Sequence, residues 1–404
     1  MDNQNIVPKL RFPGFSDNWY SKRFGDLYTF KSTNSLSRDN LNYENGEAKN
    51  IHYGDIHTKF NAQFDISKEP VPFINANIDL SKISKENYLQ QGDLVIADAS
   101  EDYADIGKSI EITNLNNEKV LAGLHTFLAR RKTEELSVRF SAFLMKTNKV
   151  RLNLMRIAQG TKVLSISSGR LSDIKLNYPS PNEQSKIASF ISAIDKQIQL
   201  LEKEKALLEK YKKGIVQKIF NREIRFKDEN GDDFTDWEEK KLGDILDYEQ
   251  PTKYLVTDTD YSNEYSIPVL TAGKTFLLGY TNETEGVFNE KLPTIIFDDF
   301  TTAFQFVDFP FKAKSSAMKM LIPKEKVNLK FVFEAMKTIK FPIAEHKRYW
   351  ISEYQLEIIP FPSPEEQTKI ASFLIDIDNL IQKTDIQLIE SIQFKTALLQ
   401  KLFV

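Results

Sequence analysis

Two groups of residues have the types and spacing that metal binding would require. His52 and His57 are five residues apart with Asp55 between them, so together they could ligate a metal ion. On the strand and loop expected here, this spacing need not place both imidazole rings on one face. Glu238-Glu239-Lys240 resembles half of a nuclease metal site, but the Pro-Asp half is missing upstream. The simpler interpretation is a loop for the histidines and an acidic turn for the glutamates.

The motifs that bind phosphates or nucleotides, or that form nucleophiles, are incomplete. Gly107-Lys108-Ser109 resembles the end of a phosphate-binding loop, but Asp102 stands where that loop needs a glycine. Neither Gly-x-Gly nor Gly-x-Ser-x-Gly occurs, and His125 and His346 have no triad context. The (Asn/Asp)-Pro-Pro-aromatic motif of the amino-methyltransferases is absent as well. We therefore predict a chain without a catalytic centre, metal ion or cofactor of its own.

Composition narrows the class of protein further. The 404 residues contain 54 Lys and Arg against 57 Asp and Glu, with 41% hydrophobic residues, which is typical of a soluble globular protein. At roughly 100–200 residues per domain, this length predicts two to four domains. The absence of cysteine excludes disulfides, thiolate zinc sites and cysteine nucleophiles. No apolar run approaches about 18 residues, so we expect a cytoplasmic protein with no membrane partner.

Charge is segregated along the chain despite the net value of −3. Residues 128–175 hold eleven Lys and Arg against three Asp and Glu, and residues 311–348 hold ten against three. Residues 221–246 are acidic, with nine Asp and Glu against five Lys and Arg. A single basic run is usually a solvated surface, but two runs at matching places favour a polyanionic partner.

Double-stranded DNA is the polyanion that these residue types suit best. Lys and Arg neutralise phosphates, while polar and aromatic side chains on loops can contact base edges. Each candidate taken alone could be ordinary surface. The predicted DNA-binding residues are Ser100, Tyr103, Lys108, Arg151, Arg156, Lys162, Arg170, Lys253, Tyr254, Lys274, Lys312, Lys314, Lys347, Arg348 and Tyr349.

The chain contains an internal repeat, which indicates how these residues are positioned. Residues 179–195 and 362–378 are identical at 12 of 17 positions, and the same offset of 183 relates residues 211–220 to 394–403. A second repeat places Trp19 and Trp237 each six residues before a Gly-Asp pair. A fainter one, offset by 191, relates Met145-Lys146-Thr147 to Met336-Lys337-Thr338. The segments between these repeats share no convincing residues, so the two halves are related modules of different content.

The strong repeat predicts one long helix in each half. Pro181 and Pro364 occupy helix starts, with Glu183 and Glu366 in the first turn, where they favour the helix dipole. Roughly 39 residues at 1.5 Å each give about 58 Å, longer than a small domain is wide. We therefore expect the two helices to pair antiparallel as a coiled coil, although packing of each on its own module stays an alternative. The predicted seam comprises Ile187, Ile194, Leu201, Leu208, Ile215, Phe373, Ile377, Leu380, Phe394 and Leu398.

The modules themselves are predicted to be α+β. Asp93 to Ala97 and Thr294 to Phe297 have the β-branched, apolar character of strands. Residues 138–157 and 328–340 are predicted helices that carry much of the basic charge. The boundaries we predict are 1–178 for the first module, 179–221 for its helix, 222–361 for the second module and 362–404 for its helix.

Taken together, the sequence resembles the specificity subunits of type I restriction–modification systems. The residues that carry the resemblance are Lys9 to Phe15 with Trp19 and Gly25-Asp26, their echo at 234–244, and the two P-S-P-x-E-Q-x-K-I-A-S-F helix starts. The resemblance covers the whole chain. It implies two target-recognition domains, each recognising one half of a split, asymmetric DNA site, and two helices that act as a spacer in a pseudo-twofold duplication.

The resemblance also implies partners that carry the chemistry. Two modification subunits would hold S-adenosylmethionine and methylate adenine, and restriction subunits would use ATP and Mg²⁺ for translocation and cleavage. This chain would then be the non-catalytic specificity subunit. Two rival hypotheses are a coiled-coil scaffold joining two protein-binding modules without DNA, and an enzyme with a metal site at His52/His57 or at Glu238 to Lys240.

Overall fold

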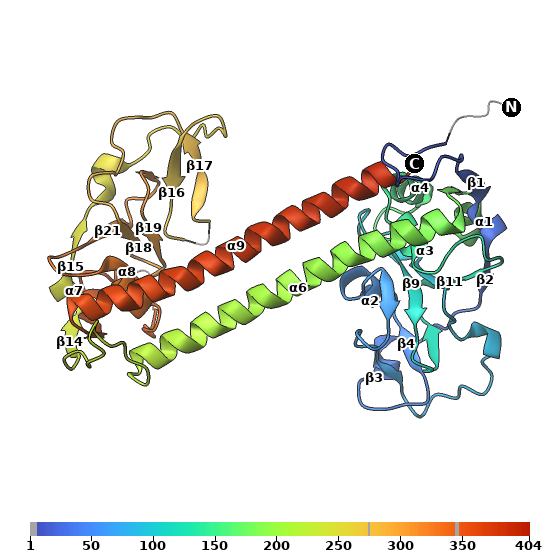
Figure 1. Ribbon diagram of the computed structural model, residues 1–404, viewed down its shortest axis with the longest axis horizontal. Coiled ribbons are helices and arrows are strands. Elements are labelled where there is room, and N and C mark those ends of the chain that lie inside the picture. The colour runs from blue at the N-terminus through green and yellow to red at the C-terminus, as the bar shows by residue number, and fades with distance from the viewer. Residues whose placement is uncertain (1–5, 274, 344–346) are drawn as a thin grey trace. The chain divides into compact units, whose positions relative to one another are not determined.

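The computed structural model describes residues 6–273, 275–343 and 347–404, and these residues divide into two compact units. Unit 1 comprises Met1–Leu201 with Gln387–Val404, and unit 2 comprises Glu202–Ile386. Each unit therefore contains one module and a part of both long helices, α6 (Pro181–Phe220) and α9 (Pro364–Leu402) (Figure 1). Within the described residues, no helix is long and apolar enough to cross a membrane.

Unit 1 contains a five-stranded sheet in the order β2-β11-β7-β9-β5 and a four-stranded sheet in the order β10-β4-β6-β3. Two-stranded ladders, β1-β13 and β12-β8, complete the strand pairing. Its elements besides the long helices are β1 (Tyr20–Arg23), α1 (Phe24–Leu27), β2 (Tyr28–Lys31), η1 (Arg38–Asn40), β3 (Leu41–Asn42), β4 (Lys49–Ile51), α2 (Tyr53–Thr58), β5 (Gln63–Asp65), β6 (Phe73–Ile74), η2 (Lys85–Asn87), β7 (Leu94–Ala97), β8 (Ala99–Ser100), β9 (Ser109–Asn114), β10 (Val120–Ala122), β11 (Thr126–Arg131), α3 (Phe140–Leu144), α4 (Asn148–Ile157), β12 (Leu164–Ser165), α5 (Ser168–Ser172) and β13 (Lys175–Tyr178).

Unit 2 is smaller, with a four-stranded sheet in the order β15-β21-β18-β19 and a three-stranded sheet in the order β17-β16-β20. The ladder β14-β22 joins the start of its module to the segment before α9. Its elements are β14 (Glu238–Lys241), α7 (Leu242–Ile245), β15 (Leu246–Glu249), η3 (Pro251–Tyr254), β16 (Ile267–Leu270), β17 (Leu277–Thr281), β18 (Thr294–Asp298), β19 (Phe304–Val307), β20 (Lys312–Ala313), β21 (Met318–Pro323), α8 (Leu329–Met336), η4 (Tyr354–Leu356) and β22 (Ile358–Phe361).

The strands predicted from β-branched runs are confirmed. All four residues of β7 are buried, as are the first four residues of β18, which suits continuous apolar strands at the centre of a sheet. The predicted helix over 138–157 is wrong at its centre, because the chain breaks it into α3 and α4. The break falls at Thr147, which has extended backbone and whose hydroxyl donates to the Leu144 carbonyl.

Both long helices begin at the predicted prolines and pack against modules at both of their ends. In unit 1 the α6 residues Ile187, Ile191 and Ile194 share a core with Leu398 and Leu402 of α9. The corresponding core of unit 2 combines Val216, Ile219 and Phe220 of α6 with Ile370, Leu374 and Ile377 of α9. The start of one helix thus meets the end of the other inside each unit.

Ion pairs show that the two helices run in opposite directions within unit 2. Lys205 pairs with Asp385 at 2.5 Å, and Lys212 pairs with Asp378 at 2.6 Å. A step of seven residues forward along α6 therefore matches a step of seven backward along α9. In unit 1, Lys395 forms an ion pair with Asp195 with the charges exchanged between the helices.

The predicted seam residues are buried or half-buried on α6, whereas those on α9 are only partly so. Ile187, Ile194 and Leu201 are buried, and Leu208 and Ile215 are half-buried. On α9, Ile377 and Leu398 are buried, whereas Leu380 and Phe394 are 52% and 54% exposed. Phe373 is half-buried beside α6–β14 loop residue Phe226, with ring centroids 5.5 Å apart. The less exposed stripe runs instead through the buried Thr384 and the half-buried Ile381, Leu388, Ser391 and Lys395, whose polar members do not stand out in an apolar pattern.

Candidate nucleic-acid interface

The helix-start motif shared by the two halves fastens each module to its long helix. The Arg11 guanidinium donates two hydrogen bonds of 2.7 Å to the buried Glu183 carboxylate. Arg225 does the same to Glu366, at 3.3 and 2.8 Å. Bidentate guanidinium–carboxylate pairs combine charge with fixed geometry, so each pair sets how the module meets its helix. The motif residues are thus occupied internally.

The glutamine that follows in each motif supports this attachment. Gln184 Oε1 accepts from the Ser137 backbone N–H at 2.8 Å, and Gln367 Oε1 accepts from the Asn328 N–H at 2.9 Å. Both amide groups donate back to a proline carbonyl just before the helix. In each unit this glutamine holds the segment that leads into α3 or α8, and therefore positions the basic residues that follow.

The cations of the first basic run are not neutralised by ion pairs from Arg139 onward. None of its Lys and Arg side chains between Arg139 and Lys175 forms an ion pair with a described Asp or Glu. Helix α4 presents Lys149 and Arg156 on its exposed side, while Val150 and Leu154 face the core. Unneutralised cations on one helix and its flanking loops are what phosphate binding requires.

The predicted residues of unit 1 lie near this helix but differ in exposure. Tyr103, Arg156, Lys162 and Arg170 are exposed, and Arg170 Nη1 donates to the Ile157 carbonyl at the end of α4. Ser100 is buried, contrary to a surface position, and its hydroxyl accepts from the Asp102 N–H at 3.0 Å. Base contact by Ser100 would need the loop to move.

Lys108 and Arg151, the remaining predicted residues of unit 1, line a cavity of about 480 Å³, hereafter the unit 1 pocket. Lys108 pairs with Asp105 at 2.5 Å and donates to the His57 carbonyl. Arg151 Nη2 donates to the Ala104 carbonyl at 3.0 Å, whereas its Nη1 is buried without a described partner. Desolvation lowers the pKa of Arg151, and Asp105 partly offsets this.

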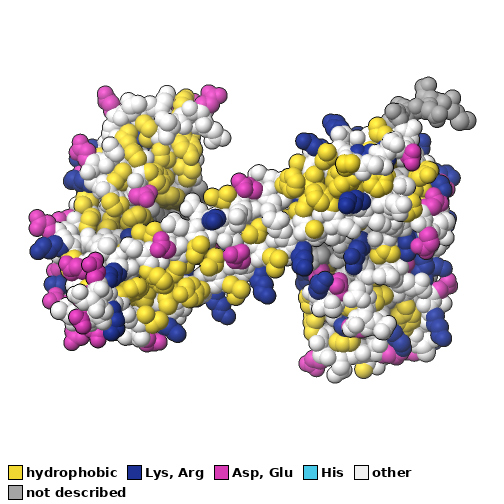
Figure 2. Space-filling model, in the orientation of Figure 1, with side chains coloured by type: hydrophobic (Ala, Val, Ile, Leu, Met, Phe, Trp, Pro, Cys, Tyr) yellow, Lys and Arg dark blue, Asp and Glu magenta, His cyan; other side chains and the backbone are white. Residues whose placement is uncertain are grey.

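The second basic run is neutralised to a much greater extent by carboxylates. Lys312 pairs with Glu283 at 2.6 Å, and Lys319 pairs with Asp299 at 3.3 Å. These partners come from distant parts of the sequence, so the charge count of the run overstates its available charge. On the face shown in Figure 2, acidic and basic side chains are accordingly interspersed rather than gathered into one basic surface.

Several predicted residues of unit 2 are occupied by other groups. Lys312 and Tyr349 are buried, contrary to a surface position, and the Tyr349 ring lies 5.3 Å from the Phe341 ring. The carboxylate of Glu249 holds Lys253 at 2.7 Å and accepts from the Tyr254 hydroxyl at 2.8 Å. In each case the side chain already has a structural role.

The other predicted residues of unit 2 are more accessible. Lys347 forms an ion pair with Glu353, and the exposed Arg348 guanidinium lies 5.5 Å from the centroid of the Phe300 ring. Lys314 is half-buried, with its ammonium 5.8 Å from the Tyr261 ring centroid. Lys274 lies outside the described residues. Arg348 and Lys314 are therefore the predicted cations of unit 2 that make no ion pair with a described carboxylate.

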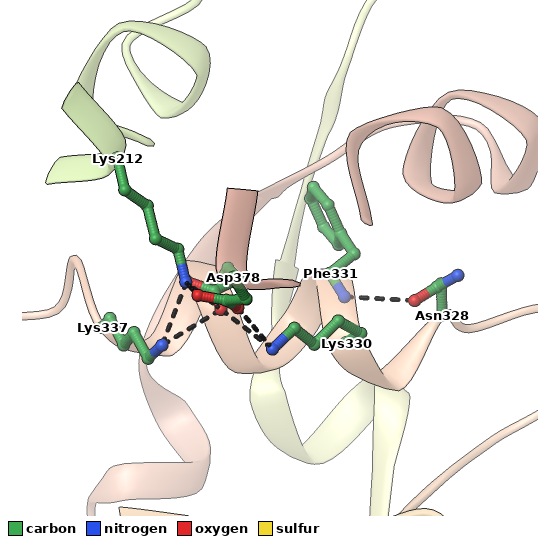
Figure 3. Close-up of polar contacts among 7 residues, drawn as sticks. Lys212, Asn328, Lys330, Phe331, Lys337 and Asp378 are labelled. Carbon is green, nitrogen blue, oxygen red and sulfur yellow. Dashed lines mark hydrogen bonds and ion pairs between the residues drawn. The ribbon is translucent and has the colours of Figure 1, made fainter. Parts of the chain in front are cut away.

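Two carboxylates neutralise the lysines around α8, and Figure 3 labels Asp378, one of the two, beside Lys212, Lys330 and Lys337. Glu334, almost fully buried, pairs with Lys212 at 3.1 Å, Lys330 at 3.3 Å and Lys337 at 3.0 Å. Asp378 of α9 also pairs with Lys212 and Lys330, at 2.6 and 3.1 Å. These contacts tie α6, α8 and α9 together inside unit 2, so the lysines serve cohesion here.

The candidate metal ligands are arranged differently from a metal site. The Asp55 carboxylate is buried and pairs with Arg38 at 3.0 Å and Lys59 at 2.9 Å. His52 Nδ1 accepts from the Gly54 N–H. Glu238 pairs with Lys240 on β14 at 2.9 Å. Among the residues described, no three His, Cys, Asp or Glu side chains are grouped as metal ligands.

Sequence reasoning did not count Lys146 or His57, which both line the unit 1 pocket, among the nucleic-acid-binding residues. Lys146 is exposed at its rim, and no described residue forms an ion pair with it. Its signal was the faint repeat that matches Met145-Lys146-Thr147 with Met336-Lys337-Thr338. His57 gave no such signal, because it reaches the pocket only through the folding of α2.

Comparison with known proteins identifies this arrangement. A family model described as the type I restriction modification DNA specificity domain matches residues 16–210 and, again, 235–393. The chain is 53% identical over 147 residues to the type I restriction enzyme EcoR124I/EcoR124II specificity subunit of Escherichia coli, a match covering 35% of this chain and 36% of that protein. It is 26% identical over 347 residues to the putative type I restriction enzyme MjaX specificity subunit of Methanocaldococcus jannaschii, covering 76% and 79%.

The solved structures agree at the level of the fold. The crystal structure of the type I restriction–modification system S subunit from M. genitalium matches with a TM-score of 0.62, at 16% identity, over 99% of both chains. A second match is a chain from a structure described as the structural basis of complex assembly and conformational transition of the type I R-M system. Its TM-score is 0.52 at 13% identity, and the match covers 98% of this chain and 99% of that one. The fold of this chain is therefore that of these proteins, with mixed helix and sheet.

Proposed function

The chain belongs to the type I restriction–modification DNA specificity family, and from this membership we propose that it is the DNA-recognition subunit of a type I enzyme. Each module recognises one half of a bipartite, asymmetric DNA site. The observation that carries the proposal is the double match of the specificity domain, once to each half, around modules of different content. Two modules of different content in one chain suit a DNA site whose two halves differ.

Unit 1 contacts DNA through α4 and the loops beside it. The supporting observation is the series of cations from Arg139 to Lys175 that have no ion-pair partner in the described chain. Lys149, Arg156 and Lys162 fix the module on the phosphates, and the exposed Tyr103 loop lies among the candidates for base contact. Unit 2 uses fewer unpaired cations, among them Arg348 and Lys314.

The two helices form an antiparallel coiled-coil spacer between two halves that arose by duplication. The repeat at offset 183 and the opposed ion pairs of α6 and α9 in unit 2 support this role. A straight helix of 40 residues is about 60 Å long, which equals roughly 18 base pairs at 3.4 Å each. The helices would therefore set the gap between the two half-sites.

The chemistry resides on partner subunits. Two modification subunits carry S-adenosylmethionine and methylate adenine, and restriction subunits use ATP and Mg²⁺. The specificity subunit is non-catalytic and determines which DNA site the enzyme binds. Outward faces of the spacer and the acidic segment 221–246 recruit these partners.

Detection of methylated adenines by long-read sequencing tests the recognition role. Cells carrying a cognate modification subunit are compared with and without this chain. We expect a new methylation motif made of two short half-sites with a fixed gap. The absence of any new motif, with the expressed complex confirmed, would contradict the proposal.

The spacer role has its own test in paired deletions. Removing residues 198–204 from α6 and 386–392 from α9 takes out one heptad from each helix. Both deletions fall between the Asp195–Lys395 and Lys205–Asp385 pairs, so these pairs and the heptad phase are kept. Seven residues correspond to about 10 Å, so the gap should shorten by about three base pairs. Deletion from α6 alone is the control and should prevent assembly, while an unchanged gap after both deletions would refute the spacer.

A further inference from the structure

The unit 1 pocket contains hydrogen-bond donors that lack acceptors. Arg151 Nη1 and His57 Nε2 are both buried without a described partner. Leaving a buried donor unsatisfied destabilises the folded state, so such groups normally have an acceptor. Burial lowers the pKa of His57, so its ring is neutral near pH 7, and in the tautomer with the proton on Nε2 it can donate one N–H without adding charge. Two residues that line one cavity therefore each carry a buried nitrogen without a described partner, which a bound acceptor could satisfy.

The charge of the pocket points to an anion. Lys59 and Lys108 line the cavity but already have Asp55 and Asp105 as partners, at 2.9 and 2.5 Å. Arg151 and Lys146 also line it and have no carboxylate partner among the described residues. Arg151 and Lys146 thus form no ion pair with a described carboxylate, and only Asp105 and Asp195 offset their charges from a longer distance.

Unit 2 supplies an internal comparison, because it has a cavity at the matching place. This unit 2 pocket has a volume of about 630 Å³ and is lined by Lys213, Val216 and Gln217 of α6 and by Lys337. The offset of 183 relates the first three to Thr396, Leu399 and Gln400, which line the unit 1 pocket. The offset of 191 relates Lys337 to Lys146. The two cavities occupy the same position in the repeated frame.

The two cavities differ in whether they contain their own anion. In unit 2, the buried Glu334 carboxylate accepts from Lys337 at 3.0 and 3.1 Å. The residue related to Glu334 by the offset of 191 is Phe143, which is buried in the core of unit 1. Unit 1 therefore keeps the lysine of this arrangement without its carboxylate.

We propose that the unit 1 pocket binds a phosphate group, with Lys146, Arg151 and His57 as its ligands. The donors come from α2, from the break between α3 and α4, and from α4 itself. A tetrahedral oxyanion offers acceptors in several directions and can satisfy all three, whereas one carboxylate offers two oxygens in a plane. The inference rests on the proposed function where the phosphate belongs to a DNA backbone, and stands apart from it where the phosphate belongs to a free small molecule.

Titration of the purified full-length chain with inorganic phosphate, at constant ionic strength maintained with chloride, tests the pocket. Isothermal calorimetry on the wild type should show one saturable site. Lys146→Gln should weaken that binding about tenfold, and Asn148→Glu, which places a carboxylate on the exposed rim, should abolish it. Lys85→Gln, an exposed change of equal charge elsewhere in unit 1, and Lys337→Gln, the counterpart in unit 2, should leave the phosphate affinity unchanged.

The outcomes separate the pocket from the recognition role. No saturable phosphate site in the wild type, or equal losses in Lys146→Gln and Lys85→Gln, would overturn the pocket. A duplex that binds the chain in the same buffer would then leave the recognition role intact. Asn148→Glu with native circular dichroism and no phosphate binding supports the site even where Lys146→Gln loses stability.

Competition identifies the source of the phosphate. A backbone phosphate is indicated if a short DNA duplex displaces inorganic phosphate, followed by ³¹P NMR, and if Asn148→Glu reduces the salt dependence of duplex binding by about one phosphate. A free phosphate compound is indicated if duplex and inorganic phosphate bind together and Asn148→Glu leaves duplex binding unchanged. Both results support a phosphate site and assign it to different ligands.

Discussion

Units 1 and 2 share an attachment frame but treat their positive charge in opposite ways. The Arg11–Glu183 and Arg225–Glu366 pairs, with the glutamine that follows each glutamate, are nearly the same in both. Around α8, the lysines form ion pairs with Glu334, whereas around α4 the cations have no carboxylate partner in the described residues. The shared residues hold the modules to the helices, and under the proposed function the residues that differ would determine what each module binds.

Exchange of one module should have the largest effect on recognition. Replacing residues 244–361 with the matching segment of another family member leaves the frame residues Arg225 and Glu366 in place. One half-site should then change completely while the other half-site and the gap stay the same, as measured by mapping methylated adenines. A change in both half-sites would show that the two units do not recognise DNA independently.

The buried carboxylate of unit 2 gives the next largest effect. Glu334→Gln leaves Lys212, Lys330 and Lys337 close together without their shared anion. Breaking a buried ion pair on one side typically costs about 3–5 kcal/mol. Urea unfolding with hydrogen exchange on α8 should show this loss in unit 2. Glu209→Gln, an exposed change of the same charge on α6, should change stability little. Equal stability of both variants would show that the Glu334 carboxylate does not stabilise unit 2.

The buried carboxylate of unit 1 should make that unit sensitive to pH. Glu111 accepts the Arg139 and Ala142 N–H groups at 2.8 and 2.7 Å and has no cation within ion-pair distance in the described structure. Burial raises the pKa of Glu111 to about 7, and these two hydrogen bonds offset only part of the shift. The folded state therefore retains a proton that the unfolded state releases near pH 4.5.

Stability of unit 1 should accordingly fall as the pH rises from 4.5 to 7, by on the order of 3 kcal/mol at most. Urea unfolding at a series of pH values, with hydrogen exchange on α3, measures this fall. Glu111→Gln should flatten the dependence, although it can lower stability overall because its amide meets one of the two N–H groups. If the stability of unit 1 depends on pH to the same extent in Glu111→Gln, other titrating groups cause that dependence.

The smallest effect concerns the salt dependence of duplex binding. Lys149→Gln with Arg156→Gln removes two unpaired cations from α4, so the slope of log affinity against log salt should fall by about two. Lys253→Gln with Lys347→Gln removes two cations that Glu249 and Glu353 already hold, and the slope should change less. Equal changes in both double variants would show that ion pairing does not decide which cations meet DNA.

The helices and their start sites could be predicted from local sequence, whereas the use of the charges could not. Pro181 and Pro364 mark the helix starts because proline suits the first turn, and the structure begins both helices there. The predicted α9 seam was wrong at Leu380 and Phe394, which are exposed, because the less exposed stripe passes through the buried Thr384 and the half-buried Ser391.

The basic runs show the same limit for the candidate site. The count over residues 311–348 could not anticipate that Lys312 would pair with Glu283, which lies 29 residues earlier in the chain. Burial of Ser100 and Tyr349 was equally hidden, because it depends on strands that arrive from elsewhere in the sequence. The number of charged residues can be counted along a chain, but the tertiary structure determines which of them form ion pairs.

The division of the chain into units has a consequence for its synthesis. Unit 2 is one continuous stretch, so all of its residues have left the ribosome once α9 has emerged as far as Ile386. Unit 1 begins to emerge first, yet Leu398, Leu402 and Phe403 belong to its core, with the Phe403 ring stacked 5.5 Å from Phe140. The module translated first is therefore completed last, and it must wait for the far end of α9 with part of its apolar surface uncovered.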